Sequence, residues 1–148
     1  MTFSKKINRL NTVFLDTAPI IYYIEAHPHF GNLVMEVVNA FQSGEITAFS
    51  SVLTLTEVLS KPLEVGNEQL AKRFVGFLNY SENLNLLEIS APIAEKAGRL
   101  RGQYPNLKTM DALQISAAIC FDIDAFVTND VRLKQIKGID IIVLKDYL

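Results

Sequence analysis

TVFLDTAPIIYYIE, residues 12–25, contains the pattern that decides the fold. Residues 12–15 form a short apolar run of β-prone side chains, which predicts a buried strand. Asp16 ends this run, and Pro19 is suited to the first turn of the helix that we expect over residues 18–25. The stretch therefore predicts a strand and a helix that are joined through one acidic residue.

The same alternation of strands and helices continues along the chain. Further strands are expected at residues 46–49, 84–89, 125–128 and 139–144. Further helices are expected at residues 30–43, 52–62, 68–80, 90–104 and 109–120, with a short helical turn at 130–136. Residues 52–58 alternate like a strand, but the length of the segment up to Pro62 favours a helix. This order predicts a three-layer α/β/α sandwich with a central five-stranded parallel sheet.

The composition is typical of one globular domain. The chain has 148 residues, 49% of them hydrophobic, with no internal repeat and no linker, so we expect a single domain over residues 1–148. One cysteine excludes a disulfide scaffold. No stretch approaches the roughly 18 consecutive apolar residues of a transmembrane helix, and the basic N-terminus precedes no cleavable apolar segment. We therefore expect a cytoplasmic protein with no membrane partner.

The charges are nearly balanced but unevenly distributed. With 14 basic and 16 acidic residues, the net charge of −2 excludes a protein that coats DNA by bulk charge. Residues 10–60 contain no Lys or Arg, whereas residues 96–110 contain several basic residues and no acid. The basic residues there are Lys96, Arg99, Arg101 and Lys108. Two explanations remain open: scattered solvated charges, or a basic approach that faces an acidic site, as enzymes that cut polyanions with metal ions need.

Four carboxylates fall at positions that a parallel sheet brings together. Asp16 ends the first strand and Asp130 follows the fourth. Glu57 lies about two turns into the helix after the second strand, and Asp111 lies in the first turn of the buried helix before the fourth. In such sheets the functional site lies at the carboxyl ends of the strands, near a switch in strand order. Taken singly, each residue also has a structural explanation, as a helix cap, a turn residue or part of a solvated helix face.

Taken together, the four carboxylates point to a metal ion. Carboxylates at one edge of a sheet repel one another, which raises the pKa of at least one of them. A divalent cation cancels this repulsion, and oxygen ligands without Cys or His favour Mg²⁺ or Mn²⁺ over Zn²⁺. A site of this kind is suited to phosphodiester hydrolysis, because the ion activates water and stabilises charge on the phosphate oxygens.

Four segments resemble the successive motifs of the PIN domain, in the same order and at the usual intervals. They are VFLDTAPIIYYIE (13–25), LTLTEVL (53–59), MDALQISAAI (110–119) and FVTND (126–130). The resemblance extends over about residues 12–146 and implies a metal-dependent nuclease with an α/β/α fold. It also implies that the catalytic residues, which hold Mg²⁺ or Mn²⁺, are Asp16, Glu57, Asp111 and Asp130.

The resemblance also implies supporting residues and partners. Thr128 and Thr17 are expected to support the site by hydrogen bonding. Ala18 departs from the family pattern, since many members have Ser or Asn there. A single domain of this length is similar to the VapC-type toxins, which are ribonucleases held inactive by a small antitoxin. By that resemblance we expect an RNA substrate, a small antitoxin partner and a homodimer.

Other functions remain as alternatives. One is a PIN-type nuclease in RNA processing that has no antitoxin. Another, from a different class, is a receiver-like phosphoacceptor signalling domain, which needs an acidic pair at its first strand and an Asp after its third. This chain has Asp16 alone at the first strand and Ser90 after the third, although Lys145 fits the fifth. A binding module that has lost catalysis is disfavoured, because all four carboxylates are present.

Overall fold

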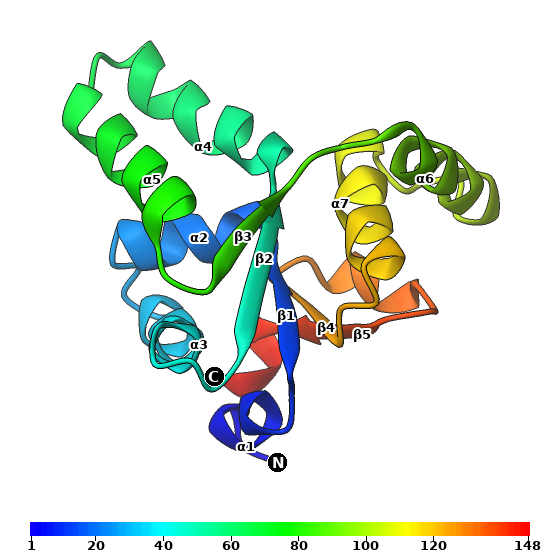
Figure 1. Ribbon diagram of the computed structural model, residues 1–148, viewed down its shortest axis with the longest axis horizontal. Helices are drawn as coiled ribbons and strands as arrows, with labels where there is room; N and C mark the ends of the chain where they lie inside the picture. Colours follow the sequence, from blue (N-terminus) through cyan, green and yellow to red (C-terminus); the bar gives the residue numbers. More distant parts are fainter.

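Five short strands lie side by side and run in the same direction in the computed structural model, which describes residues 1–148 (Figure 1). They are β1 (Thr12–Leu15), β2 (Thr47–Ser51), β3 (Leu84–Leu87), β4 (Ala125–Thr128) and β5 (Asp140–Val143). The order across the sheet is β3-β2-β1-β4-β5, and every neighbouring pair is parallel. The expected five-stranded parallel sheet is therefore confirmed.

Helices connect the strands and cover both faces of the sheet. The α-helices are α1 (Phe3–Asn8), α2 (Thr17–Ile24), α3 (Gly31–Gln42), α4 (Val52–Glu64), α5 (Glu68–Tyr80), α6 (Ala91–Gln103) and α7 (Thr109–Cys120). Two short 3₁₀ helices, η1 (Val131–Gln135) and η2 (Leu144–Tyr147), follow β4 and β5. None of the helices combines the length and the apolar character that a membrane span requires.

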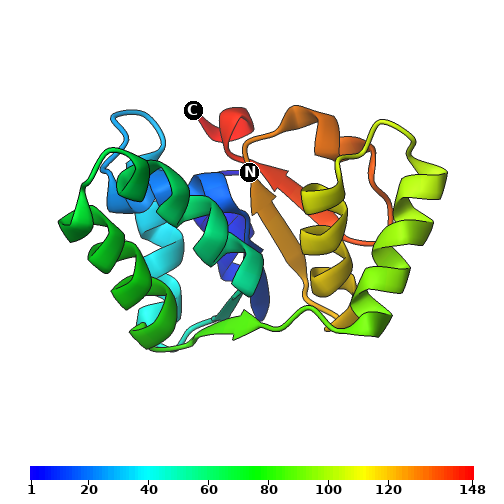
Figure 2. The same ribbon diagram turned by 90° about the horizontal axis from the view of Figure 1, so that it is seen from above.

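The side chains of each strand alternate between two apolar cores. Val13 and Leu15 of β1 join one core, which α1 to α5 cover, whereas Phe14 joins the other, which α6 and α7 cover. Phe14 stacks on Phe126 of β4, with ring centroids 5.2 Å apart. Figure 2 shows the resulting three layers, with α4 and α5 on one side of the sheet and α6 and α7 on the other. The expected α/β/α sandwich is confirmed.

The strand order reverses between β1 and β4, and this reversal creates the position for a site. From β1 the chain builds β2 and β3 outward on one side, and then returns to add β4 and β5 on the other side. The Asp16 N–H donates to the Val127 carbonyl at 3.0 Å, so the ends of β1 and β4 are held together one residue beyond the strand. Ligand sites in open parallel sheets lie at such switch points. A receiver domain has the order 2-1-3-4-5, so the receiver alternative is excluded by the topology.

Several elements differ from the sequence analysis. Strand β3 ends at Leu87 rather than at residue 89, and η2 begins at Leu144, which was expected to end the last strand. Helix α4 passes through buried Pro62 and ends at Glu64, because a proline in the last turn removes one hydrogen bond without blocking the helix. Helix α1 was not expected. The Thr2 hydroxyl caps it by accepting from the Lys5 N–H at 3.2 Å, and Phe3 and Ile7, one turn apart, are both buried. A six-residue helix shows little periodicity, so only its packing makes it visible.

Candidate active site

A cavity of about 440 Å³ opens where β1 and β4 end. Three of the four expected carboxylates, Asp16, Asp111 and Asp130, line it. They come from the loop after β1, the first turn of α7 and the loop after β4. Glu57 is not among the lining residues. The structure therefore brings together three acidic groups that are far apart in the sequence.

Asp16 is held in place by hydrogen bonds to both of its oxygens. Its Oδ1 accepts from the Thr17 N–H at 2.9 Å, as an N-cap of α2, and its Oδ2 accepts from the Thr128 hydroxyl at 2.8 Å. Asp16 is half-buried and lines the cavity. The pKa of Asp16 is raised to about 6, mainly by burial. The two hydrogen bonds lower this pKa, and the negative charges of Asp111 and Glu57 raise it.

Asp111 and Asp130 have opposite electrostatic environments. Burial raises the pKa of Asp111, and the negative charges of Asp130 and Glu57 add to the effect. The pKa of Asp130 is lowered, mainly because the Arg132 side chain donates hydrogen bonds to its carboxylate. Asp130 caps η1, and its backbone N–H donates to Thr128 Oγ1 at 3.2 Å. Thr128 thus contacts two of the three acidic residues of the cavity.

Glu57 is exposed on α4 and is connected to the site through Thr17. The Thr17 hydroxyl donates to Glu57 Oε1 at 2.7 Å, while the Thr17 N–H donates to Asp16. Both threonines expected to support the site therefore contact expected ligand residues. Because Glu57 raises the pKa values of Asp16 and Asp111, its charge acts on the cavity although its side chain does not line it.

The chemistry of these side chains fits a hard divalent cation. All four groups are carboxylates, and two of them have pKa values raised in part by their acidic neighbours, which is the repulsion that a cation relieves. No three Asp, Glu, His or Cys side chains converge closely enough to form a ligand set as they stand. The Arg132 side chain pairs with Asp130 at 2.7 Å.

A buried polar network behind the site was not found from the sequence. Gln114, one turn after Asp111 on α7, donates from Nε2 to Thr54 Oγ1 at 2.8 Å, and the Ser51 hydroxyl donates to Gln114 Oε1. The Ser50 hydroxyl donates to the Leu15 carbonyl at 2.9 Å. Every buried polar side-chain atom has a hydrogen-bond partner. The available signal was the single amide inside an otherwise apolar helix, at residue 114.

The four expected RNA-contacting residues are separated by the fold. Lys108, directly before α7, lines a second cavity of about 340 Å³ together with Asp111 and Asp130. The others lie on α6, where Arg99 pairs with Glu95 at 3.3 Å and Arg101 Nε donates to the Leu107 carbonyl at 3.0 Å. Lys96 is also on α6. Only Lys108 borders a cavity with the acidic residues, so the structure does not join the four into one surface at the site.

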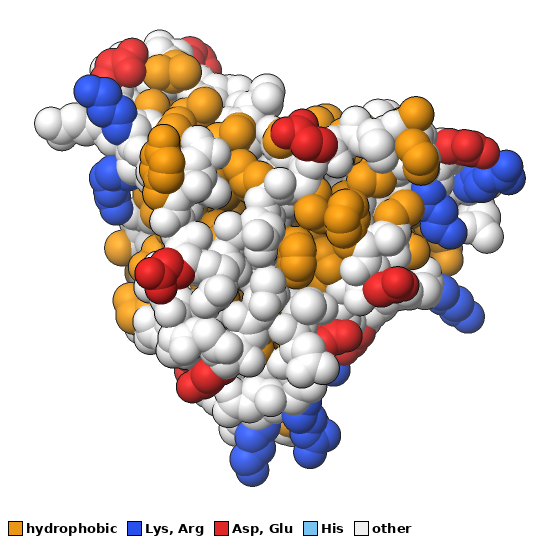
Figure 3. Space-filling view, in the orientation of Figure 1, with side chains coloured by type: hydrophobic (Ala, Val, Ile, Leu, Met, Phe, Trp, Pro, Cys, Tyr) orange, Lys and Arg blue, Asp and Glu red, His pale blue; other side chains and the backbone are white.

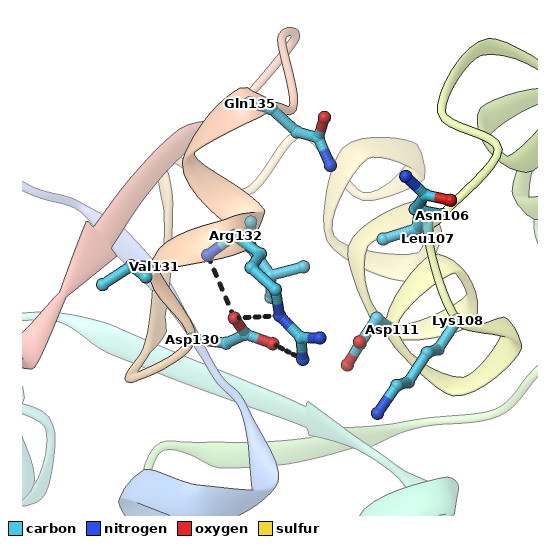
Figure 4. Close-up of a pocket in the computed structure, with 9 residues that line it drawn as sticks. Asn106, Leu107, Lys108, Asp111, Asp130, Val131, Arg132 and Gln135 are labelled. Carbon is cyan, nitrogen blue, oxygen red and sulfur yellow. Dashed lines mark hydrogen bonds and ion pairs between the residues drawn. The ribbon is translucent and has the colours of Figure 1, made fainter.

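Figure 3 shows how charge is arranged on one face of the molecule. Lys and Arg side chains lie at its outer ends, near α6, α1 and the α4–α5 pair, and hydrophobic atoms gather between them. This face therefore carries no continuous basic path. Basic groups next to the acidic residues line the two cavities instead. Arg132 and Lys145 line the first, and Lys108 and Arg132 face the region of Asp111 at the second (Figure 4).

Comparison with known proteins agrees with the architecture. The family model of the PIN domain matches residues 13–139. A chain of the VapBC2 complex from Rickettsia felis, solved with a promoter DNA fragment, has a TM-score of 0.72 and 22% identity over 88% of this chain and 96% of that chain. A chain of the DNA-bound VapBC complex of Salmonella typhimurium has a TM-score of 0.72 and 22% identity over 90% of this chain and 98% of that chain.

A third solved structure is VapC20 of Mycobacterium tuberculosis, described as a toxin that cleaves the sarcin–ricin loop. It has a TM-score of 0.68 and 14% identity over 86% of this chain and 97% of that chain. At such identities the likeness is one of fold. Comparison of the sequence with curated proteins gives no match.

Proposed function

Because the chain belongs to the PIN domain family, whose members are nucleases, we propose that it is a metal-dependent endoribonuclease. One observation carries the proposal: Asp16, Asp111 and Asp130 line one cavity at the switch point of a parallel sheet. The raised pKa of Asp16 supports it, since negative charge from Asp111 and Glu57 contributes to the shift. We place this activity in the cytoplasm.

Asp16, Asp111 and Asp130 would hold Mg²⁺ or Mn²⁺, with Glu57 as the fourth carboxylate. When bound, the ion activates a water molecule and neutralises charge on the phosphate. The side chains of the protein orient the carboxylates that would hold the ion. Thr17 and Thr128 fix the two oxygens of Asp16, so that its carboxylate faces the cavity in one orientation. Thr17 also positions Glu57, which places its charge near Asp16.

The decisive experiment is cleavage of single-stranded RNA by the purified protein with Mg²⁺, with Mn²⁺ and with EDTA. We expect cleavage with either ion and none with EDTA, and an Asp16→Asn variant should be inactive at any ion concentration. Ser116→Ala is the matched control for handling and contaminating ribonuclease, because Ser116 is buried between α7 and α6 and bonds only the Ile93 carbonyl, at 2.6 Å. Cleavage that persists in EDTA, or in Asp16→Asn, contradicts the proposal.

We further propose that the activity is that of a type II toxin with a small antitoxin partner. The supporting observations are the fold shared with chains of VapBC complexes and the single domain that matches them over nearly their whole length.

The partner proposal is tested by expressing the chain together with any short open reading frame that lies beside its gene. A stable complex that blocks RNA cleavage supports the toxin assignment. A nuclease whose neighbouring genes give no inhibitor supports the alternative of an RNA-processing enzyme without an antitoxin. Light scattering of the isolated chain tests the proposed homodimer, which predicts twice the 16.6 kDa of one chain.

A further inference from the structure

Arg132 bonds both oxygens of the Asp130 carboxylate. Its Nε donates to Oδ1 at 3.0 Å and its Nη2 donates to Oδ2 at 2.7 Å, which is a two-point contact between guanidinium and carboxylate (Figure 4). The Arg132 backbone N–H also donates to Oδ1, at 3.0 Å. Asp130 is the only expected metal ligand with an ion-pair partner. An ion that binds Asp130 would therefore meet oxygens that already bond Arg132, next to a positive charge that opposes its approach.

The side chain of Arg132 can separate from Asp130 while a backbone hydrogen bond still holds the Asp130 carboxylate. The Arg132 side chain is 67% exposed, so its departure removes little packing. An exposed ion pair is also weak compared with a bound divalent cation. After departure, the backbone N–H of Arg132 still holds Oδ1, and Asp130 keeps its orientation towards the cavity. The guanidinium is thus the exchangeable part of the contact and the backbone bond is the fixed part.

Arg132 borders both cavities at the site. It lines the cavity of about 440 Å³ with Asp16 and also the cavity of about 340 Å³ with Lys108. Figure 4 shows its side chain reaching from η1 towards α7, where Asp111 and Lys108 lie. Two cations thus flank the carboxylates from opposite sides of the smaller cavity. Its other lining side chains include the amides of Asn106 and Gln135.

The chemistry of this arrangement matches a phosphodiester. A phosphate presents two oxygens with nearly the spacing of a carboxylate, and a guanidinium binds both at once. We propose that Arg132 exchanges partners: it pairs with Asp130 in the metal-free protein, and binds a phosphate of the RNA backbone once a cation takes the carboxylate. The inference rests on the proposed nuclease function. It assigns Arg132 as a substrate-binding residue and as a competitor of the metal ion.

The test measures Mn²⁺ affinity and RNA cleavage separately, on the same variants. Mn²⁺ binding is titrated by calorimetry without RNA for wild type, Arg132→Gln and Arg132→Lys. Removing the competitor should tighten Mn²⁺ binding in Arg132→Gln by roughly fivefold, the worth of a good exposed ion pair. At saturating Mn²⁺ the same variant should lose at least about tenfold in kcat/KM for RNA, because one charged phosphate contact is missing. Arg132→Lys keeps the charge without the two-point geometry and should lie between wild type and Arg132→Gln in both measurements.

The matched control is Lys134→Gln, which removes the same charge from the same 3₁₀ helix. Lys134 pairs with Asp146 at 2.6 Å and lines neither cavity, so both measurements should stay at wild-type values. Opposite changes in the two measurements distinguish partner exchange from a structural role, which would weaken both. Arg132→Gln with unchanged or weaker Mn²⁺ binding overturns the competition, and wild-type cleavage by this variant overturns the phosphate contact. A wild-type protein that neither binds Mn²⁺ nor cleaves RNA overturns the proposed function and this inference with it.

Discussion

Asp16 and Asp130 show how position alone gives two aspartates opposite properties. Asp16 lies among protein atoms, which disfavours its charged form and raises its pKa to about 6. Asp130 is more exposed and bonds to Arg132, which favours its charged form and lowers its pKa. In the metal-free protein at neutral pH, the ionised form of Asp16 therefore destabilises the folded state, whereas the ionised form of Asp130 stabilises it.

The pKa of Asp16 predicts how the stability of the metal-free protein changes with pH. The unfolded chain ionises Asp16 near 3.8, whereas the native protein retains the proton up to about 6. Because the native state binds more protons in this range, the free energy of unfolding falls as pH rises. We expect this one group to lower it by about 2 kcal/mol between pH 4.5 and 7.

Urea denaturation in EDTA at the two pH values, for wild type and Asp16→Asn, measures this contribution. Groups that do not interact with Asp16 titrate equally in both proteins, so the difference between their pH slopes reports Asp16 together with its coupling to Asp111 and Glu57. Asn keeps the shape of the side chain but does not ionise. Equal slopes in the two proteins would show that burial does not perturb Asp16. The lowered pKa of Asp130 acts in the opposite direction, stabilising the fold above about pH 4 and losing that effect below it.

At the scale of elements, α4 and α7 are fixed relative to each other by buried hydrogen bonds. Gln114 on α7 bonds to Thr54 on α4 and to Ser51 at the end of β2. Asp111 lies one turn before Gln114, and Glu57 lies one turn after Thr54. The network therefore sets the relative position of two expected ligands without touching either of them.

Gln114→Leu should weaken both the fold and metal binding. The change leaves the Ser51 and Thr54 hydroxyls without their amide partner in an apolar layer, which costs about 1–3 kcal/mol. Urea denaturation measures this loss, and calorimetric titration should also give a larger Kd for Mn²⁺. Ser116→Ala is the control, because Ser116 joins α7 to α6 and not to α4. It should lose stability and keep wild-type Mn²⁺ affinity. If Gln114→Leu also keeps that affinity, the network stabilises the fold only.

The position of Lys108 predicts a difference among the basic residues. Lys108 borders the cavity with Asp111, while Arg99 is paired with Glu95 on α6. Lys108→Gln should weaken RNA binding and reduce the slope of log affinity against log salt by about 0.7–1, the value of one phosphate contact. Arg99→Gln should leave the slope unchanged. Fluorescence anisotropy of labelled single-stranded RNA over a salt series measures the affinity and its salt dependence for each variant. Equal slopes for wild type and Lys108→Gln would show that Lys108 contacts no phosphate.

At the scale of the whole molecule, the site joins segments that are distant in the chain. Asp16, Asp111 and Asp130 come from three connections of the sheet, and their mutual repulsion opposes the folded state when no cation is present. A cation that binds only the native state stabilises it by RT ln(1 + [L]/Kd), which is about 2.7 kcal/mol at a concentration of 100 Kd. Metal binding and folding are therefore coupled.

Asp111→Asn tests this coupling. The variant removes one repelling charge and keeps the shape, so in EDTA it should be at least as stable as wild type. Mn²⁺ should raise the melting temperature of wild type and change that of the variant little, and the variant should lose RNA cleavage by orders of magnitude. Melting curves of both proteins with and without Mn²⁺ give the answer. If Asp111 only stabilises the start of α7, Asn would cost a few tenths to about 1 kcal/mol and Mn²⁺ would affect neither protein.

The sequence alone determined the order of elements and the chemistry expected at their ends. Helix α7 is apolar nearly all round, and α5 is clearly amphipathic, so the ranges 109–120 and 68–80 follow from local pattern. Asp16, Asp111 and Asp130 each stand where an element begins or ends, and Glu57 lies about two turns into the helix after the second strand. These features depend on neighbours within a turn or two along the chain.

Only the tertiary structure decided how those residues are connected. The bond from Thr128 to Asp16 joins residues 112 positions apart, and that from Gln114 to Thr54 joins residues 60 apart. It also placed Glu57 against Thr17 rather than in the cavity, and Lys108 apart from the other basic residues. Periodicity carries no information about which side chains meet across such separations. Their meeting follows from strand order and helix packing, because these bring the ends of β1, β4 and α7 to one edge of the sheet.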